Sequence, residues 1–79
     1  MKFANKNLTV LAYANGYTFW HYITEGTIEE LEKNDRFFAP ISTLMKKGDV
    51  IYVTANDGLT YHRQIIDLSI DTVKIGKIN

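Results

Sequence analysis

The chain has 79 residues, 46% of them hydrophobic and 23% charged, and its Lys and Arg residues balance its Asp and Glu residues to a formal net charge of zero. This size predicts one domain spanning residues 1–79, and the hydrophobic fraction is typical of a globular domain and argues against a disordered chain. The absence of cysteine excludes disulfides and thiolate metal sites, while the balanced charge counts against nucleic acid as the main partner.

Residues 1–7 are expected to be loosely ordered, and residues 8–24 then predict a β-hairpin. Alternation over residues 8–14 separates Leu8, Val10, Ala12 and Ala14 from Thr9, Leu11 and Tyr13. Asn15-Gly16 is the residue pair that favours a type I′ turn. In the second strand, alternation places Tyr17, Phe19, His21 and Ile23 on one face and Thr18, Trp20, Tyr22 and Thr24 on the other. Since both faces carry aromatic side chains, one should lie in the core and the other at an interface, and the sequence leaves open which.

Two short helices are expected between the second and third strands. Thr27 and Glu30 form a capping-box pattern that predicts a helix over residues 28–33. Pro40 suits the first turn of a second helix, in which Ile41, Leu44 and Met45 would form one apolar stripe. The intervening Phe37 and Phe38 are expected to fill the core between helix and sheet.

The rest of the chain predicts three more strands. Residues 49–55 are rich in β-branched side chains, and residues 56–58 form a turn signal. Residues 59–68 and 71–78 each alternate between apolar and polar side chains, as strands do. The predicted fold is therefore mainly β (α+β): a small antiparallel sheet or a partly closed five-stranded barrel, with the two helices covering one end.

Catalytic and metal-binding patterns are weak. His21 and His62 could bind zinc together with Glu25 or Asp57, but the two histidines are not spaced i,i+4 on a helix and no cysteine lies beside them. Ser42 and Ser69 lie outside any nucleophile pattern, and the glycines are dispersed among turns rather than gathered in a phosphate-binding loop. We therefore expect no enzymatic activity, no metal and no cofactor.

The aromatic side chains favour a protein–protein interface, because Tyr and Trp are enriched in such surfaces. A domain this small often gains stability by oligomerisation, so the protein is expected to bind itself. The candidate interface residues are Tyr13, Tyr17, Phe19, Trp20, His21, Tyr22, Phe37 and Phe38. The alternative is a small β-barrel that binds single-stranded nucleic acid or a peptide through residues 17–22, although no Lys or Arg lies between Lys6 and Lys33.

Three strings of residues resemble small proteins encoded among the virion-structure genes of tailed bacteriophages. They are YANGYTFWHY (13–22), FFAP (37–40) and LMKKGDVI (44–51). The corresponding strings of that family are YANGF-x-x-WHY, YF-x-P and L-x-x-GD-x-I. The resemblance covers roughly residues 8–55, and Phe37 stands where the family tends to have Tyr.

The resemblance implies a capsid decoration or cement protein that forms a homotrimer and binds the major capsid protein. No apolar run is long enough to cross a membrane, and residues 1–10 show no secretion-signal pattern, so no membrane partner is expected. The expected location is the capsid surface of a virion, after synthesis in the host cytoplasm.

Overall fold

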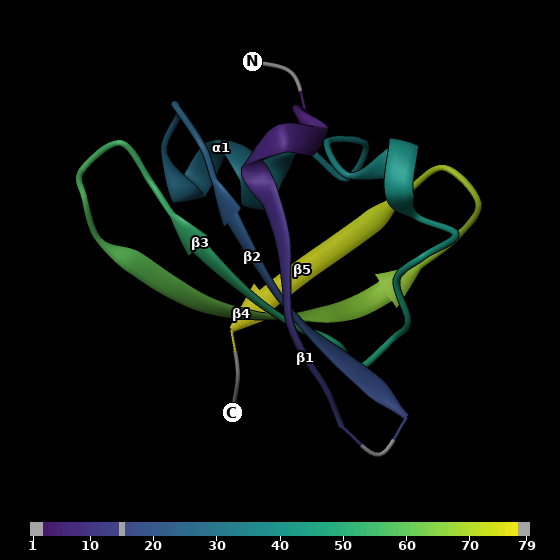
Figure 1. Ribbon diagram of the computed structural model, residues 1–79. Helices are drawn as coiled ribbons and strands as arrows, with labels where there is room; N and C mark the ends of the chain where they lie inside the picture. The colour runs from purple at the N-terminus through teal and green to yellow at the C-terminus, as the bar shows by residue number, and fades with distance from the viewer. Residues whose placement is uncertain (1–2, 15, 78–79) are drawn as a thin grey trace.

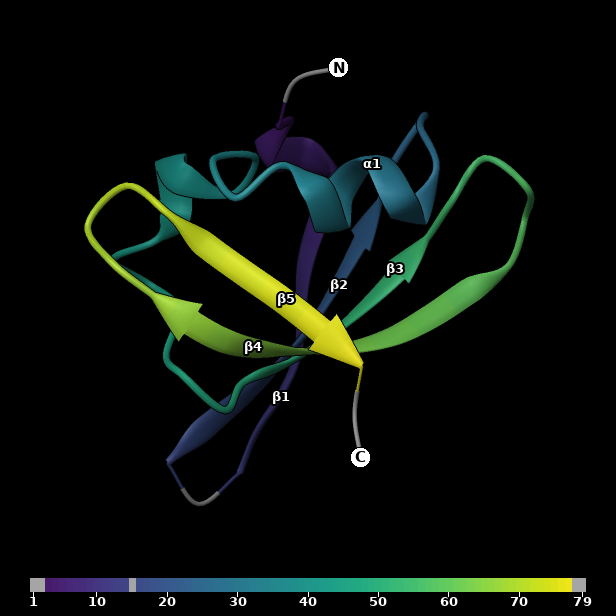
Figure 2. The ribbon, with the colours of Figure 1, turned by 180° about the vertical axis from the view of Figure 1, so that it is seen from behind.

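The computed structural model describes residues 3–14 and 16–77, which form one five-stranded sheet covered on one face by a helical segment. In chain order the strands are β1 (Leu8–Ala14), β2 (Tyr17–Ile23), β3 (Val50–Thr54), β4 (Thr60–Leu68) and β5 (Val73–Lys77). The helical elements are the 3-10 turns η1 (Asn5–Asn7) and η2 (Ala39–Ile41) and the α-helix α1 (Ile28–Lys33). Figures 1 and 2 show these elements on one side of a strongly twisted sheet.

The sheet is mixed and open, with strand order β1-β2-β3-β4-β5. β2 and β3 pair in parallel, while the other neighbours are antiparallel. The prediction of a purely antiparallel sheet is therefore wrong for this pair. The reason is that residues 24–49 cross back over the sheet, so that β3 starts beside the start of β2; a crossover of this kind is the usual link between parallel strands. Among the described residues β1 and β5 do not pair, so the predicted barrel closure is not present.

The core lies between the helical segment and the face of the sheet turned toward it, which we call the inner face. It contains Trp20, Tyr22, Ile28, Leu31, Phe37, Phe38, Ile41, Met45, Ile51, Val53, Ile65, Val73 and Ile75. Phe37 and Phe38 pack edge to face at 5.0 Å between ring centroids and occupy the predicted place between helix and sheet. Aromatic pairs of this geometry contribute about 0.5–1.5 kcal/mol beyond the area they bury.

Helix α1 is confirmed over the predicted residues. The Glu30 backbone N–H donates to the Thr27 hydroxyl at 3.2 Å, and the Thr27 N–H donates to the Glu30 carboxylate at 3.1 Å. This capping box satisfies two N–H groups that the first helical turn leaves without partners. No helix in the described parts of the chain has the length and apolar character needed to span a bilayer.

Replacing Thr27 with alanine is expected to lower the free energy of unfolding by about 1 kcal/mol, the usual contribution of an N-cap hydroxyl. Urea denaturation followed by circular dichroism measures the change. The exposed Thr43 provides the control, since Thr43→Ala removes a hydroxyl outside the capping box. Equal midpoints for the two variants would contradict the role of the cap.

The predicted second helix is wrong. Only η2 forms, and its hydrogen bonds span three residues: the N–H of Ser42 donates to Ala39 and that of Leu44 to Ile41. The chain then turns because the Lys46 backbone N–H donates to the Asp49 carboxylate at 3.0 Å instead of continuing a helical ladder. As a result Leu44 is 65% exposed and does not share a buried stripe with Met45.

Residues 3–7 pack against the core, in contrast to the expected loose order; residues 1 and 2 lie outside the described residues. The Phe3 ring stacks on that of Tyr22 with centroids 5.4 Å apart, and the Ala4 N–H donates to the Tyr22 hydroxyl at 2.9 Å. The phenol of Tyr22 is thereby satisfied inside the core. The expected turn residue Asn15 also lies outside the described residues, while its neighbour Gly16 has φ +95°, a conformation that favours glycine.

Candidate protein-protein interface

The pairing register decides which face of β2 is exposed. Residues that lie opposite each other on neighbouring strands share one face of the sheet. Trp20 lies opposite Ile51 and Tyr22 opposite Val53, and all four side chains are buried in the core. The intervening Tyr17, Phe19, His21 and Ile23 therefore belong to the opposite face, which we call the outer face.

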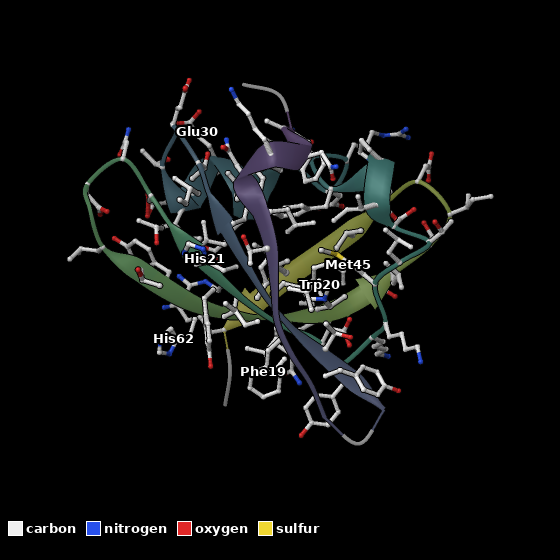
Figure 3. All side chains as sticks on the ribbon, in the orientation of Figure 1. Phe19, Trp20, His21, Glu30, Met45 and His62 are labelled. Carbon is white, nitrogen blue, oxygen red and sulfur yellow. The ribbon has the colours of Figure 1, made fainter. Side chains whose placement is uncertain are left out.

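Four rings cross the outer face in a row that we call the aromatic stripe: Tyr17, Phe19, Tyr52 and His62. Tyr17 stacks on Phe19 with centroids 5.8 Å apart, and Phe19 meets Tyr52 edge-on at 6.4 Å. Tyr52 contacts His62 at 4.5 Å. The stripe thus joins β2, β3 and β4, and Figure 3 shows Phe19 and His62 on the side of the sheet away from Trp20 and Met45. Its rings are exposed or half-buried, so they are available to a partner.

The outer face around the stripe carries no formal charge. Its outward positions in β1 to β3, and in β4 as far as Gln64, hold no Asp, Glu, Lys or Arg among the described residues. Charged side chains reappear at Asp67 and Lys74, which pair beyond the irregularity of β4. Buried centres of protein interfaces are depleted of charge and enriched in aromatic rings. The composition of this face therefore matches that of an interface.

The two histidines share the outer face but do not converge. Tyr52 lies between them, paired with His21 on β2 and His62 on β4, so the histidine backbones are two strand spacings apart, about 10 Å. The His21 Nε2 is 2.9 Å from the Thr54 hydroxyl, which in turn contacts Thr60. Within the described residues no three His, Cys, Asp or Glu side chains gather as a metal site requires.

The candidate serine nucleophiles have structural partners. Ser42 is buried and donates its hydroxyl to the carbonyl of Ile70 at 2.6 Å. The Ser69 hydroxyl contacts that of Thr72 in the turn between β4 and β5. In neither contact is the partner a histidine or a carboxylate, the groups that activate a hydroxyl in nucleophilic catalysis.

A buried carboxylate holds β2 from the inner side. Asp49 is fully buried, and its two oxygens accept hydrogen bonds from the Thr18 backbone N–H, the Trp20 Nε1–H and the Lys46 backbone N–H, each at 3.0 Å. Two of these donors lie directly before and after Phe19. Asp49 therefore fixes the part of β2 that presents Phe19 on the outer face.

The predicted interface residues divide between core and surface. Trp20, Tyr22, Phe37 and Phe38 are 1–5% exposed and fill the core of this chain, so their side chains have little surface to offer. Tyr17, Phe19 and His21 lie on the outer face. Tyr13 is 67% exposed but lies on the inner side of β1.

The position of Tyr13 departs from the predicted alternation. Val10 lies opposite Trp20 and Tyr13 opposite Thr18, and the register shifts at Leu11 between them. A β-bulge of this kind inserts one residue and turns the following side chains to the other face. Val10 and Tyr13 consequently share the inner side, although simple alternation separates them.

Two important residues were not singled out from the sequence. Tyr52 becomes part of the stripe only through the register of three strands. Asp49 belongs to no catalytic or metal pattern in the sequence, although it lies directly after Gly48 at the start of a predicted strand. The sequence signal for this site is an acidic residue just before an apolar strand together with a tryptophan at a core position. These two features could have indicated that Asp49 accepts a hydrogen bond from Trp20.

The turn between β3 and β4 carries a coupled pair, Asp57 and Tyr61. The Tyr61 hydroxyl donates to the Asp57 carboxylate at 2.5 Å, and the Leu59 N–H donates to the other oxygen at 2.9 Å. The Tyr61 bond and then the Leu59 bond lower the pKa of Asp57 below its ordinary 3.8, and the same bond to Asp57 raises the pKa of Tyr61 above 10.0. The hydrogen bond therefore stabilises the fold at pH values between the lowered pKa of Asp57 and the raised pKa of Tyr61. It is lost as pH falls through the lowered pKa of Asp57, or rises through the raised pKa of Tyr61.

Replacing Tyr61 with phenylalanine is expected to raise the pKa of Asp57 toward 3.8, because the largest cause of its lowering is removed. A ¹³C NMR titration of the Asp57 carboxyl measures the change. Tyr17→Phe, on the other side of the sheet, should leave that titration unaltered. An unchanged Asp57 titration in Tyr61→Phe would contradict the assigned cause.

Comparison of the chain with models of protein families, with curated protein sequences and with solved structures gives no match. The resemblance to phage virion proteins therefore stays a prediction from the strings at residues 13–22, 37–40 and 44–51.

Proposed function

We propose that this protein is a non-enzymatic, self-associating structural protein that uses the outer face of its sheet as a protein-binding surface. The observation that carries the proposal is an aromatic stripe within the part of the outer face, β1 to β3 and β4 as far as Gln64, whose described residues carry no formal charge. A partner surface that covers Phe19 and Tyr52 desolvates apolar rings without stripping water from ions. Burial of such rings is the usual source of strong contacts at interfaces.

The setting that we propose is the head of a tailed bacteriophage, where the protein would act as a trimeric decoration protein on the shell of the major capsid protein. The supporting observations are the resemblance of residues 13–22 and the two later strings to virion proteins, and the exposed outer face. A decoration protein requires a stable small fold, a contact with its own copies and a contact with the shell. Association would also add stability to a domain of 79 residues.

Binding of single-stranded nucleic acid through the same strand is the competing function. Aromatic rings stack on bases, but nucleic-acid grooves also need cations for the phosphates. The outward positions of β2, β3 and β4 up to Gln64 provide none among the described residues. The uncharged face therefore favours a protein partner.

Sedimentation velocity over a wide concentration range tests the proposal together with a shell-binding assay. We expect an oligomer at tens of micromolar, and co-sedimentation with empty shells of a major capsid protein encoded beside this chain. A stable monomer that does not bind the shells would refute the proposal. Fluorescence anisotropy with a labelled oligothymidylate at low salt tests the competing function, and tight binding there would favour it.

A further inference from the structure

A groove lies on the inner side of β1, away from the outer face. It has a volume of about 430 Å³ and is lined mainly by Leu8, Val10, Tyr13, Trp20 and Leu44. Val10, Tyr13 and Leu44 are 56%, 67% and 65% exposed, so the apolar walls face solvent. Scattered exposed apolar residues are ordinary, but several around one hollow indicate a binding surface.

The bulge at Leu11 builds this groove. Because the register shifts there, Val10 and Tyr13 project to the same side and form one wall, with Leu44 opposite. If β1 paired regularly, without the shift at Leu11, Tyr13 would lie on the outer face. Bulges often re-aim a side chain at functional sites.

The groove runs beside a free strand edge. β1 is an edge strand of seven residues and contains no charged residue or proline. The other edge strand, β5, is shorter, carries Lys74 and Lys77, and its Val73 N–H donates to the carbonyl of Asp35 at 2.7 Å. Charges and covering segments are the usual protection of sheet edges against added strands. Among the described residues β5 has this protection, whereas β1 has only its bulge.

The exposed charges next to the groove are basic. None of its described lining residues is charged, but Lys6, Lys46 and Lys47 are exposed and lie within three positions of the lining residues Asn5 and Leu44. The Asp49 carboxylate, which contacts the lining residues Thr18 and Trp20, is fully buried. Lys46 is held near the groove because Asp49 binds its backbone N–H and that of the lining residue Thr18. An acidic ligand therefore complements this end of the groove.

We propose that the groove docks an extended apolar-acidic peptide segment of a partner protein. An apolar side chain of the segment sits between Tyr13 and Leu44, and an acidic side chain meets Lys46 or Lys47. The segment lies along the edge of β1, in the manner of strand addition, with main-chain pairing limited to the stretches on either side of Leu11. This groove is separate from the outer face. Failure of peptide binding in the groove would therefore leave the proposed interface on the outer face unaffected, and the reverse also holds.

Three capped peptides test the inference by NMR titration of the ¹⁵N-labelled chain: Ac-ELELE-amide, Ac-KLKLK-amide and Ac-EGEGE-amide. We expect ELELE to shift the resonances of Val10, Tyr13 and Leu44 in a saturable manner. KLKLK and EGEGE should bind at least about tenfold more weakly, a difference of 1.4 kcal/mol, because one has the wrong charge and the other lacks the apolar side chains.

Variants at exposed positions sharpen the test. Leu44→Ser should abolish the ELELE shifts, while Leu59→Ser removes a similarly exposed leucine from the turn between β3 and β4 and should change nothing. The double variant Lys46→Glu, Lys47→Glu should reverse the preference toward KLKLK. The inference would be overturned if ELELE does not bind, if ELELE and KLKLK bind with equal affinity, or if the shifts centre on Phe19 and Tyr52. It would also be overturned if the groove resonances move on dilution without peptide, because that result would assign the groove to a second copy of the chain.

Discussion

Replacing Phe19 with serine is expected to weaken self-association about 30-fold or more, corresponding to about 2 kcal/mol at a central aromatic contact. Phe19 is the centre of the aromatic stripe, since its ring contacts both Tyr17 and Tyr52. The side chain lies on the outer face and is not part of the core, so the variant should still fold. Sedimentation velocity gives the association constant, and circular dichroism checks the fold.

Trp20→Phe is the matched control, because Trp20 is the next residue but lies on the inner face. It loses the Nε1–H bond to Asp49 and should lower the free energy of unfolding by about 1–3 kcal/mol. Association of the folded chain should stay at the wild-type value. Equal loss of association in the two variants would show that the outer face is not the interface.

Replacing Asp49 with alanine is expected to produce the largest loss of stability, about 3–5 kcal/mol, since three N–H donors around a fully buried site lose their acceptor. A domain of 79 residues has a total stability of about 4–12 kcal/mol at 0.05–0.15 kcal/mol per residue. A wild-type stability at the lower end of this range would leave the variant partly unfolded at 25 °C. Urea titration of the wild type and variant, followed by circular dichroism, measures the difference.

Asp49→Asn keeps the shape but turns an N–H₂ group toward an N–H donor, and should lose about 2–4 kcal/mol. Asp35→Asn removes the same charge at an exposed position and should change the stability by less than about 0.5 kcal/mol. If Asp49→Ala unfolds within 1 kcal/mol of the wild type, the carboxylate does not hold β2 in place. Loss of the Trp20 hydrogen bond should also alter the tryptophan emission spectrum.

Local signals predicted much of the fold correctly. The hairpin of β1 and β2 follows from alternation around Asn15-Gly16, and α1 follows from Thr27 and Glu30. These features depend on interactions between residues within a few positions of each other, so a short stretch of sequence is enough to predict them. The same is true of β3 to β5, whose antiparallel pairings connect neighbouring strands.

Features that depend on distant residues could not be predicted. The parallel pairing of β2 with β3 is decided by the path of residues 24–49 across the sheet, which no local pattern encodes. The second helix does not form because the Asp49 carboxylate, three positions after Lys46, accepts the Lys46 N–H. This carboxylate is also bonded to Thr18 and Trp20 of the distant strand β2, which no local pattern encodes. The bulge at Leu11 likewise has no signal in alternating apolar residues.

The candidate site shows the same division. Alternation separated Phe19 and His21 from Trp20 and Tyr22, but the sequence left open which set is buried. The buried carboxylate of Asp49, together with the helical segment, decides that Trp20 faces inward. Tyr52 and His62 join the stripe because of register, which is a property of the whole sheet.

The parallel seam between β2 and β3 also has a consequence for the order of folding. The hairpin β1–β2 and the meander β3–β4–β5 each rely on contacts between neighbouring strands and can form quickly, whereas the seam requires closure of a long loop; Thr18 and Asp49, for example, are 31 positions apart. Docking of the two halves is therefore expected to be the slow step. Phe19 belongs to one half and Tyr52 to the other, so the aromatic stripe is completed only at that step. A nascent chain thus lacks the complete stripe until it is folded, and the proposed self-association would wait for the folded subunit.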